Sequence, residues 1–135
     1  MSSHKSRRSF IKKTAIGAGI FIVPRNVLGG PGYISPSDQL NLAAIGSGGK
    51  GISDIANASV NGRERVSALC DVDFSGSASR SVKRFPNAKL YSDFREMLDK
   101  EKDIDAVTIS TPDHAHAPAA VYAMERDKHV YVQKP

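Results

Sequence analysis

The fold is decided by the stretch LNLAAIGSGGKG, residues 40–51, in which an apolar strand runs directly into the turn motif G-x-G-x-x-G. Gly46 permits the tight turn off the strand, Gly48 lets backbone N–H groups approach a pyrophosphate, and Gly51 lets the next helix pack closely on the strand. The phosphates then lie at a helix N-terminus, where unpaired N–H groups and the helix dipole favour negative charge. The motif therefore predicts a dinucleotide site on a strand–turn–helix unit.

A second apolar strand ends in an acid at the spacing that such a site requires. The strand is expected at Arg65–Cys70, and Asp71 follows twenty residues after Gly51. A carboxylate there accepts hydrogen bonds from ribose hydroxyls. It should also repel a 2′-phosphate, because two like charges about 4 Å apart cost about 4 kcal/mol at an effective dielectric near 20. We therefore expect NAD rather than NADP, although the basic residues on the next helix could offset part of this repulsion; they are Arg80, Lys83 and Arg84.

Strands and helices alternate along the rest of the chain. We predict strands at 40–45, 65–70, 88–91, 106–110 and 129–132, and helices at 49–60, at 75–84, from the capping pair Asp93 and Glu96, and from Pro118 to about Arg126. This alternation predicts an α/β fold with a doubly wound parallel sheet of the Rossmann type. A complete dinucleotide fold has six strands, so we interpret residues 38–135 as a sheet truncated after the fifth strand, with a C-terminal substrate domain absent.

The net charge of +5 comes from the N-terminal region. Six Lys and Arg residues and no acid precede residue 38, so the remainder holds 13 basic and 14 acidic residues. A basic surface for nucleic acid is therefore not supported.

The first 37 residues have the pattern of an address signal. The run SRRSFIK at 6–12, followed by an apolar region at 15–23, resembles a twin-arginine export signal. The apolar region is too short for a stable transmembrane helix. We assign residues 1–37 to this signal and a linker, and predict export to the periplasm by the twin-arginine machinery, with the cleavage site left open.

Two alternative sites receive little support. His114 and His116 could suggest a metal pair with Asp113, but no further His or Cys lies at ligand spacing, so we predict no metal site. The P-loop pattern G-x-x-x-x-G-K-[ST] is not present. The single cysteine, Cys70, cannot form an internal disulfide and is expected to be a buried strand thiol.

Three loci should meet the glycine-rich turn at the carboxyl ends of the strands. They are the stretch CDVD at 70–73, the loop STPDHAH at 110–116, and the ending DKHVYVQKP at 127–135. Together they resemble the Gfo/Idh/MocA family of NAD(P)-dependent oxidoreductases, which has an acid in a C-D-V-D-like stretch, a T-P-x-x-x-H loop and a G-K-H-V-x-x-E-K-P ending. The resemblance covers roughly residues 38–135.

The resemblance implies a role for each matching residue. Residues 46–51 would hold the pyrophosphate, Asp71 the adenine ribose, and residues 110–112 with His116 the nicotinamide ribose. Gln133 replaces the family's glutamate, and Lys134 matches the catalytic lysine that hydrogen-bonds the hydroxyl to be oxidised. The implied cofactor-binding residues are Gly46, Ser47, Gly48, Gly49, Lys50, Gly51, Asp71, Ser110, Thr111, Pro112, His116 and Gln133.

The resemblance also implies hydride transfer between a sugar or polyol hydroxyl and a nicotinamide cofactor, and a homo-oligomer for the full-length protein. Because free NAD is scarce outside the cytoplasm, we expect an exported enzyme to hold its cofactor tightly and regenerate it in each cycle. One alternative is an NAD-dependent glycosidase that transiently oxidises the sugar at C3. Another is that the 135-residue chain alone is a nucleotide-binding fragment without catalytic activity.

Overall fold

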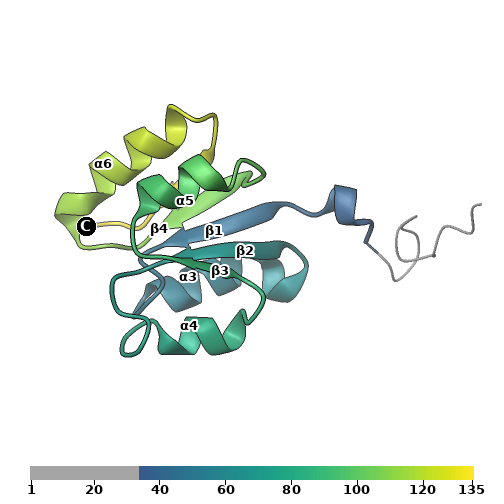
Figure 1. The fold of residues 1–135 in the computed structure, drawn as a ribbon, viewed down its shortest axis with the longest axis horizontal. Helices are drawn as coiled ribbons and strands as arrows, with labels where there is room; N and C mark the ends of the chain where they lie inside the picture. Colours follow the sequence, from purple (N-terminus) through teal and green to yellow (C-terminus); the bar gives the residue numbers. More distant parts are fainter. Residues whose placement is uncertain (1–33) are drawn as a thin grey trace, which may run out of the picture. The chain divides into compact units, whose positions relative to one another are not determined.

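The computed structural model describes residues 34–135. The predicted twin-arginine motif and the apolar region after it lie outside the described residues. The fold is carried by the unit Pro36–Pro135, drawn in colour in Figure 1. Among residues 34–135, every helix is too short or too polar to cross a membrane.

Five parallel strands form one sheet in the order β3-β2-β1-β4-β5. The strands are β1 (Asn41–Ile45), β2 (Arg65–Cys70), β3 (Lys89–Tyr91), β4 (Ala106–Ile109) and β5 (His129–Val132). The register between β1 and β2 shifts after Leu42, where the hydroxyl of Ser67 donates to the Leu42 carbonyl. This strand order is that of the first five strands of a dinucleotide-binding fold, which confirms the predicted doubly wound parallel sheet.

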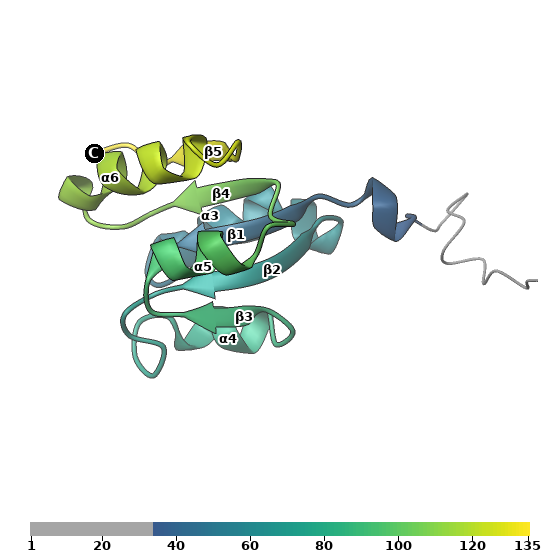
Figure 2. The same cartoon turned by 45° about the horizontal axis from the view of Figure 1, so that its top comes forward.

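Helices cover both faces of the sheet (Figures 1 and 2). The helical segments are η1 (Pro36–Asp38), α3 (Gly51–Ala58), η2 (Val60–Gly62), α4 (Ser79–Arg84), α5 (Phe94–Lys100) and α6 (Asp113–Met124), of which α3 and α4 lie on one face and α5 and α6 on the other. Successive residues of β1 point to opposite faces, so Ile45 packs in the cluster with Met97 of α5, and Ala44 in the one with Ile55 of α3. Because both faces are buried, β1 is continuously apolar from Leu42 to Ile45 instead of alternating with polar residues.

The predicted start of α6 was wrong. The helix begins at Asp113, so Pro118 lies inside it and His116 belongs to its first half rather than to a loop. Pro112 adopts an extended conformation immediately before the helix, and its carbonyl accepts the N–H of Ala115. Pro118 lacks an N–H to donate and its ring crowds the carbonyl four residues before it, but it lies in the first half of the helix, and the surrounding alanines favour helix strongly enough to continue it.

The start of α4 also lies later than residue 75. Residues 75–78 form a turn in which the carboxylate of Asp73 accepts the backbone N–H groups of Gly76 and Ser77, at 2.9 and 3.0 Å. These two backbone hydrogen bonds hold the pKa of Asp73 below its usual value, and the one from Ser77 has the larger effect. Asp73 therefore orders the approach to α4, as an acid at a helix start commonly does.

Candidate dinucleotide-binding site

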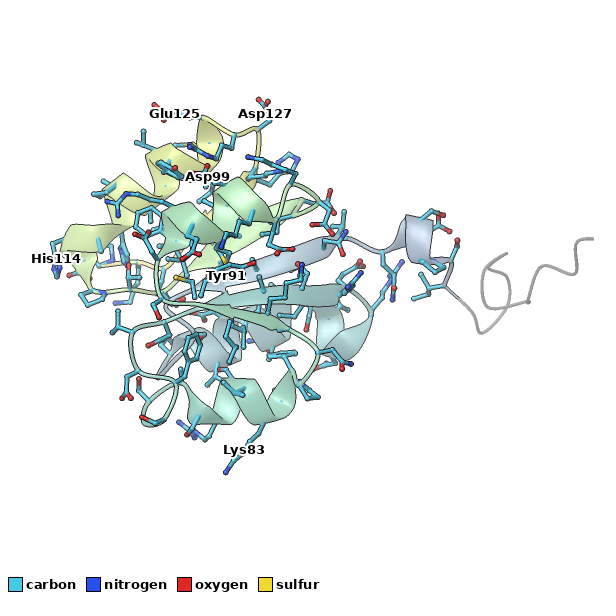
Figure 3. All side chains as sticks on the ribbon, in the orientation of Figure 1. Lys83, Tyr91, Asp99, His114, Glu125 and Asp127 are labelled. Carbon is cyan, nitrogen blue, oxygen red and sulfur yellow. The ribbon has the colours of Figure 1, made fainter. Side chains whose placement is uncertain are left out.

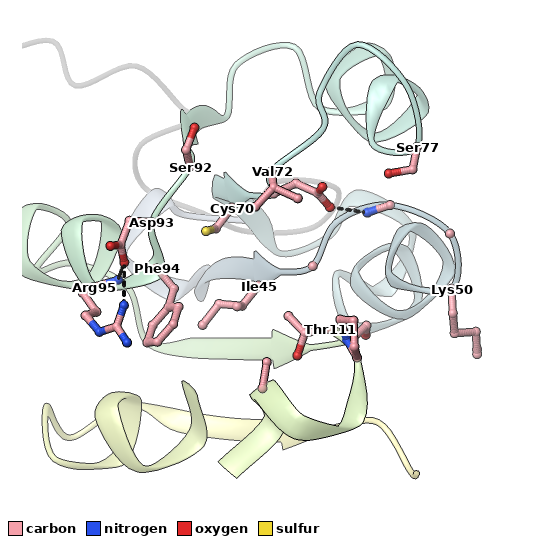
Figure 4. Close-up of a pocket in the computed structure, with 17 residues that line it drawn as sticks. Ile45, Lys50, Cys70, Val72, Ser77, Ser92, Asp93, Phe94, Arg95 and Thr111 are labelled. Atoms are coloured by element: carbon pink, nitrogen blue, oxygen red, sulfur yellow. Dashed lines mark hydrogen bonds and ion pairs between the residues drawn. The ribbon is translucent and has the colours of Figure 1, made fainter. Parts of the chain in front are cut away.

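A cavity of about 700 Å³ lies at the carboxyl ends of the central strands (Figure 4). Ligands of doubly wound sheets bind in this position, and the volume falls in the range of small-molecule sites. Eight of the twelve predicted cofactor-binding residues line it: Gly46, Gly48, Gly49, Lys50, Asp71, Ser110, Thr111 and Pro112. The structure thus brings together the glycine-rich turn, Asp71 and the loop at residues 110–112, which lie up to 66 positions apart in the sequence. None of the residues 127–135 lines the cavity.

The first and third glycines of the turn are required by close backbone packing. Gly46 has φ +79°, and a Cβ there would lie 2.8 Å from the backbone of Ser110 and Thr111. A Cβ on Gly51 would overlap with the carbonyl oxygen of Gly46. Gly51 therefore lets α3 begin directly against the end of β1, as the sequence predicts.

The second glycine of the motif has a neighbour that the sequence did not indicate. A Cβ on Gly48 would lie 2.6 Å from the hydroxyl oxygen of Ser77, in the loop between β2 and α4. Gly49 has φ +51° and open space where its Cβ would be. The turn is thus packed on the β2–α4 loop at Gly48 and free on the side of Gly49.

Asp71 is joined to the glycine-rich turn by a direct hydrogen bond. Its Oδ2 accepts the backbone N–H of Gly48 at 2.9 Å, drawn as a dashed line in Figure 4, and its Oδ1 accepts the N–H of Asp73 at 3.0 Å. Each carboxylate oxygen has a second acceptor position, so the group can still receive ribose hydroxyls. The three basic residues of α4 do not line this cavity, and Lys83 points away from the sheet at the surface of that helix (Figure 3).

The loop after β4 lines the cavity and contains a buried hydroxyl without a partner among the described residues. Thr111 lines the cavity, and within residues 34–135 its buried Oγ1 has no hydrogen-bond partner. His116 lies behind this loop, with Nε2 at 2.7 Å from the carbonyl oxygen of Thr111, and does not line the cavity. His114 is exposed at the surface (Figure 3), whereas His116 is buried, so the two imidazoles lie in different environments. Among residues 34–135, no cluster of His, Cys, Asp and Glu could hold a metal ion.

Three other predicted residues lie outside the cavity lining. Ser47 is fully buried, and its carbonyl accepts the hydroxyl of Ser81. Gln133 continues the ladder beyond β5, donating its backbone N–H to Ile109 at 2.9 Å. Lys134 is exposed, and its Nζ lies 3.2 Å from the carbonyl oxygen of Pro135. Their predicted contacts with cofactor or substrate stay predictions.

Asp54, in the first turn of α3, is a site residue that the sequence analysis missed. Its side chain is only 4% exposed and accepts hydrogen bonds from Lys50, Ser110 and Gln133. Burial alone would raise the pKa of this carboxyl, but the three hydrogen bonds outweigh it, so the pKa lies below its usual value. Its spacing of three residues from Gly51 was the available signal, because residues at i and i+3 share a helix face.

The loops after β2 and β3 supply the other wall, and its part after β3, residues 92–95, was also missed. Val72 and residues 92–95 line the cavity there, and the guanidinium of Arg95 lies 4.6 Å from the ring centre of Phe94. Asp93 caps α5 by accepting the N–H of Arg95 at 2.8 Å, as its capping pattern predicts. Cys70 also faces this wall, and burial, with smaller contributions from Asp93 and Asp71, raises its pKa to about 12.

The residues present fit a dinucleotide. The Oγ1 of Thr111 offers an unused buried polar group, the turn at Gly49 leaves open space, and α3 directs its N-terminus toward the same end of the sheet. Asp71 supplies an acceptor at the position of a ribose.

Comparisons with known proteins agree with this geometry. Residues 40–135 match the profile of the Gfo/Idh/MocA family, described as an oxidoreductase family with an NAD-binding Rossmann fold. A glycosyl hydrolase family 109 protein of Solibacter usitatus is 34% identical, and the match covers 96% of this chain and 33% of that protein. An alpha-N-acetylgalactosaminidase of Shewanella oneidensis is 32% identical, with 77% of this chain and 24% of that protein covered.

Among solved structures, the fold is similar to myo-inositol dehydrogenase from Lactobacillus casei in complex with NAD(H) and myo-inositol. The TM-score is 0.63 at 30% identity, and the match covers 72% of this chain and 29% of that one. The chain thus spans between about a quarter and a third of the length of these relatives. The family match extends over most of the described residues and includes the whole cavity. The chain belongs to the Gfo/Idh/MocA family, and residues 40–135 form its NAD-binding Rossmann fold.

Proposed function

We propose that the intact protein transfers a hydride between NAD and a carbon that bears a sugar or polyol hydroxyl. The observation that carries this proposal is the single cavity that joins the glycine-rich turn and Asp71 to the loop at residues 110–112. The similarity to an inositol dehydrogenase supports a polyhydroxylated substrate.

When bound, the nicotinamide ring supplies the acceptor for the hydride that leaves the substrate carbon. The chain's own residues hold and orient the reactants. Residues 46–51 hold the pyrophosphate, Asp71 the adenine ribose, and the hydroxyl of Thr111 the nicotinamide ribose. Lys134, acting as the neutral amine, hydrogen-bonds the reacting hydroxyl and takes up its proton to become an ammonium, while the carbon–oxygen bond becomes a carbonyl.

A second candidate is redox-assisted cleavage of a glycoside. It is supported by the relatives named as glycosyl hydrolase family 109 proteins and an alpha-N-acetylgalactosaminidase. Both candidates begin with the same oxidation, and they differ in the fate of the ketone. In the first, a keto-sugar or lactone leaves; in the second, the ketone is reduced again after the glycosidic bond has broken.

The product distinguishes the two candidates. The intact protein is incubated with inositols, free sugars and aryl glycosides, while dinucleotide absorbance at 340 nm and the released products are followed. Net formation of NADH with a keto product supports the first candidate. Release of the aglycone with no net NADH supports the second. If neither substrate class reacts while NAD binds, the proposal is wrong.

We also propose that residues 1–37 direct export by the twin-arginine machinery and that the exported enzyme keeps its NAD bound. The signal is tested by fusing residues 1–37 to a reporter and replacing Arg7 and Arg8 together by lysine. Loss of the reporter from the periplasm supports the signal, and unchanged export contradicts it. A preparation free of dinucleotide and fully dependent on added NAD contradicts tight retention.

A further inference from the structure

One buried carboxylate connects three loops of the site. Asp54 Oδ1 accepts Lys50 Nζ at 2.8 Å, and its Oδ2 accepts the Ser110 hydroxyl at 2.7 Å and Gln133 Nε2 at 3.0 Å. These donors follow β1, β4 and β5, and the last two lie 56 and 79 residues beyond Asp54 in the sequence. The sheet brings these loops to the same edge, and the carboxylate of Asp54 then fixes their positions relative to one another.

The side chain of Gln133 is held at both ends. Its Nε2 donates to Asp54, while its Oε1 accepts the backbone N–H of Lys134 at 2.9 Å. An ionised carboxylate only accepts hydrogen bonds, so it requires the NH₂ group of Gln133 to face it. The amide oxygen is thereby left to hold the backbone of Lys134. A continuous path of hydrogen bonds thus runs from α3 to the backbone of Lys134.

The charge of Asp54 is well supported at this position. A carboxylate that is 4% exposed is stable as an anion only when it is paired and fully hydrogen-bonded, and here one cation and two neutral donors surround it. A glutamate at position 133 would instead place a second carboxylate against it. Asp54 and Gln133 are thus a matched acceptor and donor.

We infer that Asp54 is a positioning residue, which acts through Gln133 to set the place of Lys134 and acts directly on Ser110. The expected loss of kcat rests on the proposed function, in which Lys134 is catalytic. The expected faster exchange of the Lys134 backbone amide does not depend on the proposed function.

The test compares Asp54→Asn, Gln133→Glu and the double variant that exchanges amide and carboxylate, all in the intact protein. In Asp54→Asn, the new NH₂ group can face the NH₂ group of Gln133, so that two donors meet. In Gln133→Glu, two carboxylates face each other, so that two acceptors meet. The double variant again pairs one donor with one acceptor. Because a displacement of about 1 Å at a reacting group can cost roughly a hundredfold in rate, each single variant should lose tenfold to a hundredfold in kcat. The KM for NAD should change less than threefold, and the double variant should recover most of kcat.

Hydrogen exchange supplies a readout besides activity. The amide of Lys134 should exchange at least tenfold faster in each single variant and return to near the wild-type rate in the double variant. Asn57→Ala, on the exposed side of the same helix, is the matched control and should alter neither quantity. If Asp54→Asn fails to fold, Gln133→Met, which removes both the donor to Asp54 and the acceptor of the Lys134 N–H, should loosen the Lys134 amide at least as much.

Wild-type kcat and wild-type Lys134 protection in Asp54→Asn or, if it does not fold, in Gln133→Met would overturn the inference. A double variant no better than the worse single variant would overturn it as well. If the wild type oxidises no polyol and cleaves no glycoside, the proposed function fails, and the exchange rates still decide whether Asp54 positions Lys134.

Discussion

Replacing Gly51 by alanine should lower both the stability of the fold and its affinity for NAD, although alanine has the higher helix propensity. Alanine in a helix is ordinarily more stable than glycine by about 1 kcal/mol. At position 51, however, the added methyl would overlap with the Gly46 carbonyl oxygen, well inside the 3.0 Å that real Cβ atoms keep. That oxygen belongs to the backbone at the end of β1 and cannot turn aside, so α3 would have to move by roughly 1 Å or more.

The movement acts on stability and on binding together. Ile55 is fully buried under the same helix, and overpacking of this kind costs typically about 1–3 kcal/mol. After the gain in propensity, we expect a net loss of up to about 2 kcal/mol in the free energy of unfolding. The N-terminus of α3 would also leave the position of the pyrophosphate, so the affinity for NAD should fall by roughly 10- to 100-fold.

Denaturant unfolding and titration with NAD measure the two effects in the intact protein. Gly62→Ala is the control, because Gly62 also has a positive φ, +96°, but has open space around its missing Cβ. It should lose about 1–2 kcal/mol of stability through backbone strain alone and keep its NAD affinity. A Gly51→Ala protein that is as stable as the wild type and binds NAD equally well would refute the close-packing argument.

Three further predictions concern charge and protonation. Asp71→Asn removes the charge but keeps an acceptor for the Gly48 N–H, so the ratio of the affinities for NAD and NADP should fall by up to roughly a thousandfold. Parallel titrations with the two cofactors measure this ratio, and an unchanged ratio would contradict the role of the carboxylate. Because the pKa of Cys70 is about 12, iodoacetamide at pH 8 should leave it unmodified in the folded protein and alkylate it after unfolding, as mass spectrometry would show. Hydrogen bonds from Lys89 and Tyr91 lower the pKa of Glu101, so its stabilising contribution is present above pH 4.5 and is lost as the pH falls through the lower folded value. Glu101→Gln should therefore cost at most about 1 kcal/mol at pH 7 and flatten the acid side of the stability profile, and an unchanged profile would exclude this origin.

The sequence predicted the strands more reliably than the helix starts. Arg65–Cys70 and His129–Val132 were predicted with their observed bounds, because short, mainly apolar runs between polar or turn residues favour strands over helices. The start of α6 was misplaced because Pro118 is favourable in a first helical turn and also tolerable further in. Local sequence preferences do not distinguish clearly between a helix start at Asp113 and one near Pro118. The contact of His116 with the Thr111 carbonyl favours the longer helix.

The cavity was predicted on the side where motifs occur and missed where they do not. Glycines and acids at fixed spacing identified Gly46 and Asp71, because the residues at these motif positions of dinucleotide-binding folds act through backbone geometry and charge. The wall formed by residues 92–95, Phe94 among them, carries no such pattern, since apolar contacts tolerate many side chains. Its location follows instead from topology, because β3 lies beside β2 and parallel strands end at the same edge of the sheet.

Asp54 shows where a single sequence gives too little information. Read along the chain, it is an acid one turn into an amphipathic helix and four residues after Lys50, which matches an exposed ion pair. Its burial depends on Ser110 and Gln133, which reach it only once β4 and β5 have joined the sheet. The same dependence gives the residue its proposed importance, because a carboxylate that three separate loops must satisfy also fixes those loops relative to one another. A residue of this kind is found from the folded structure, by asking which buried charges have donors from several elements, and then tested by exchanging the two partners.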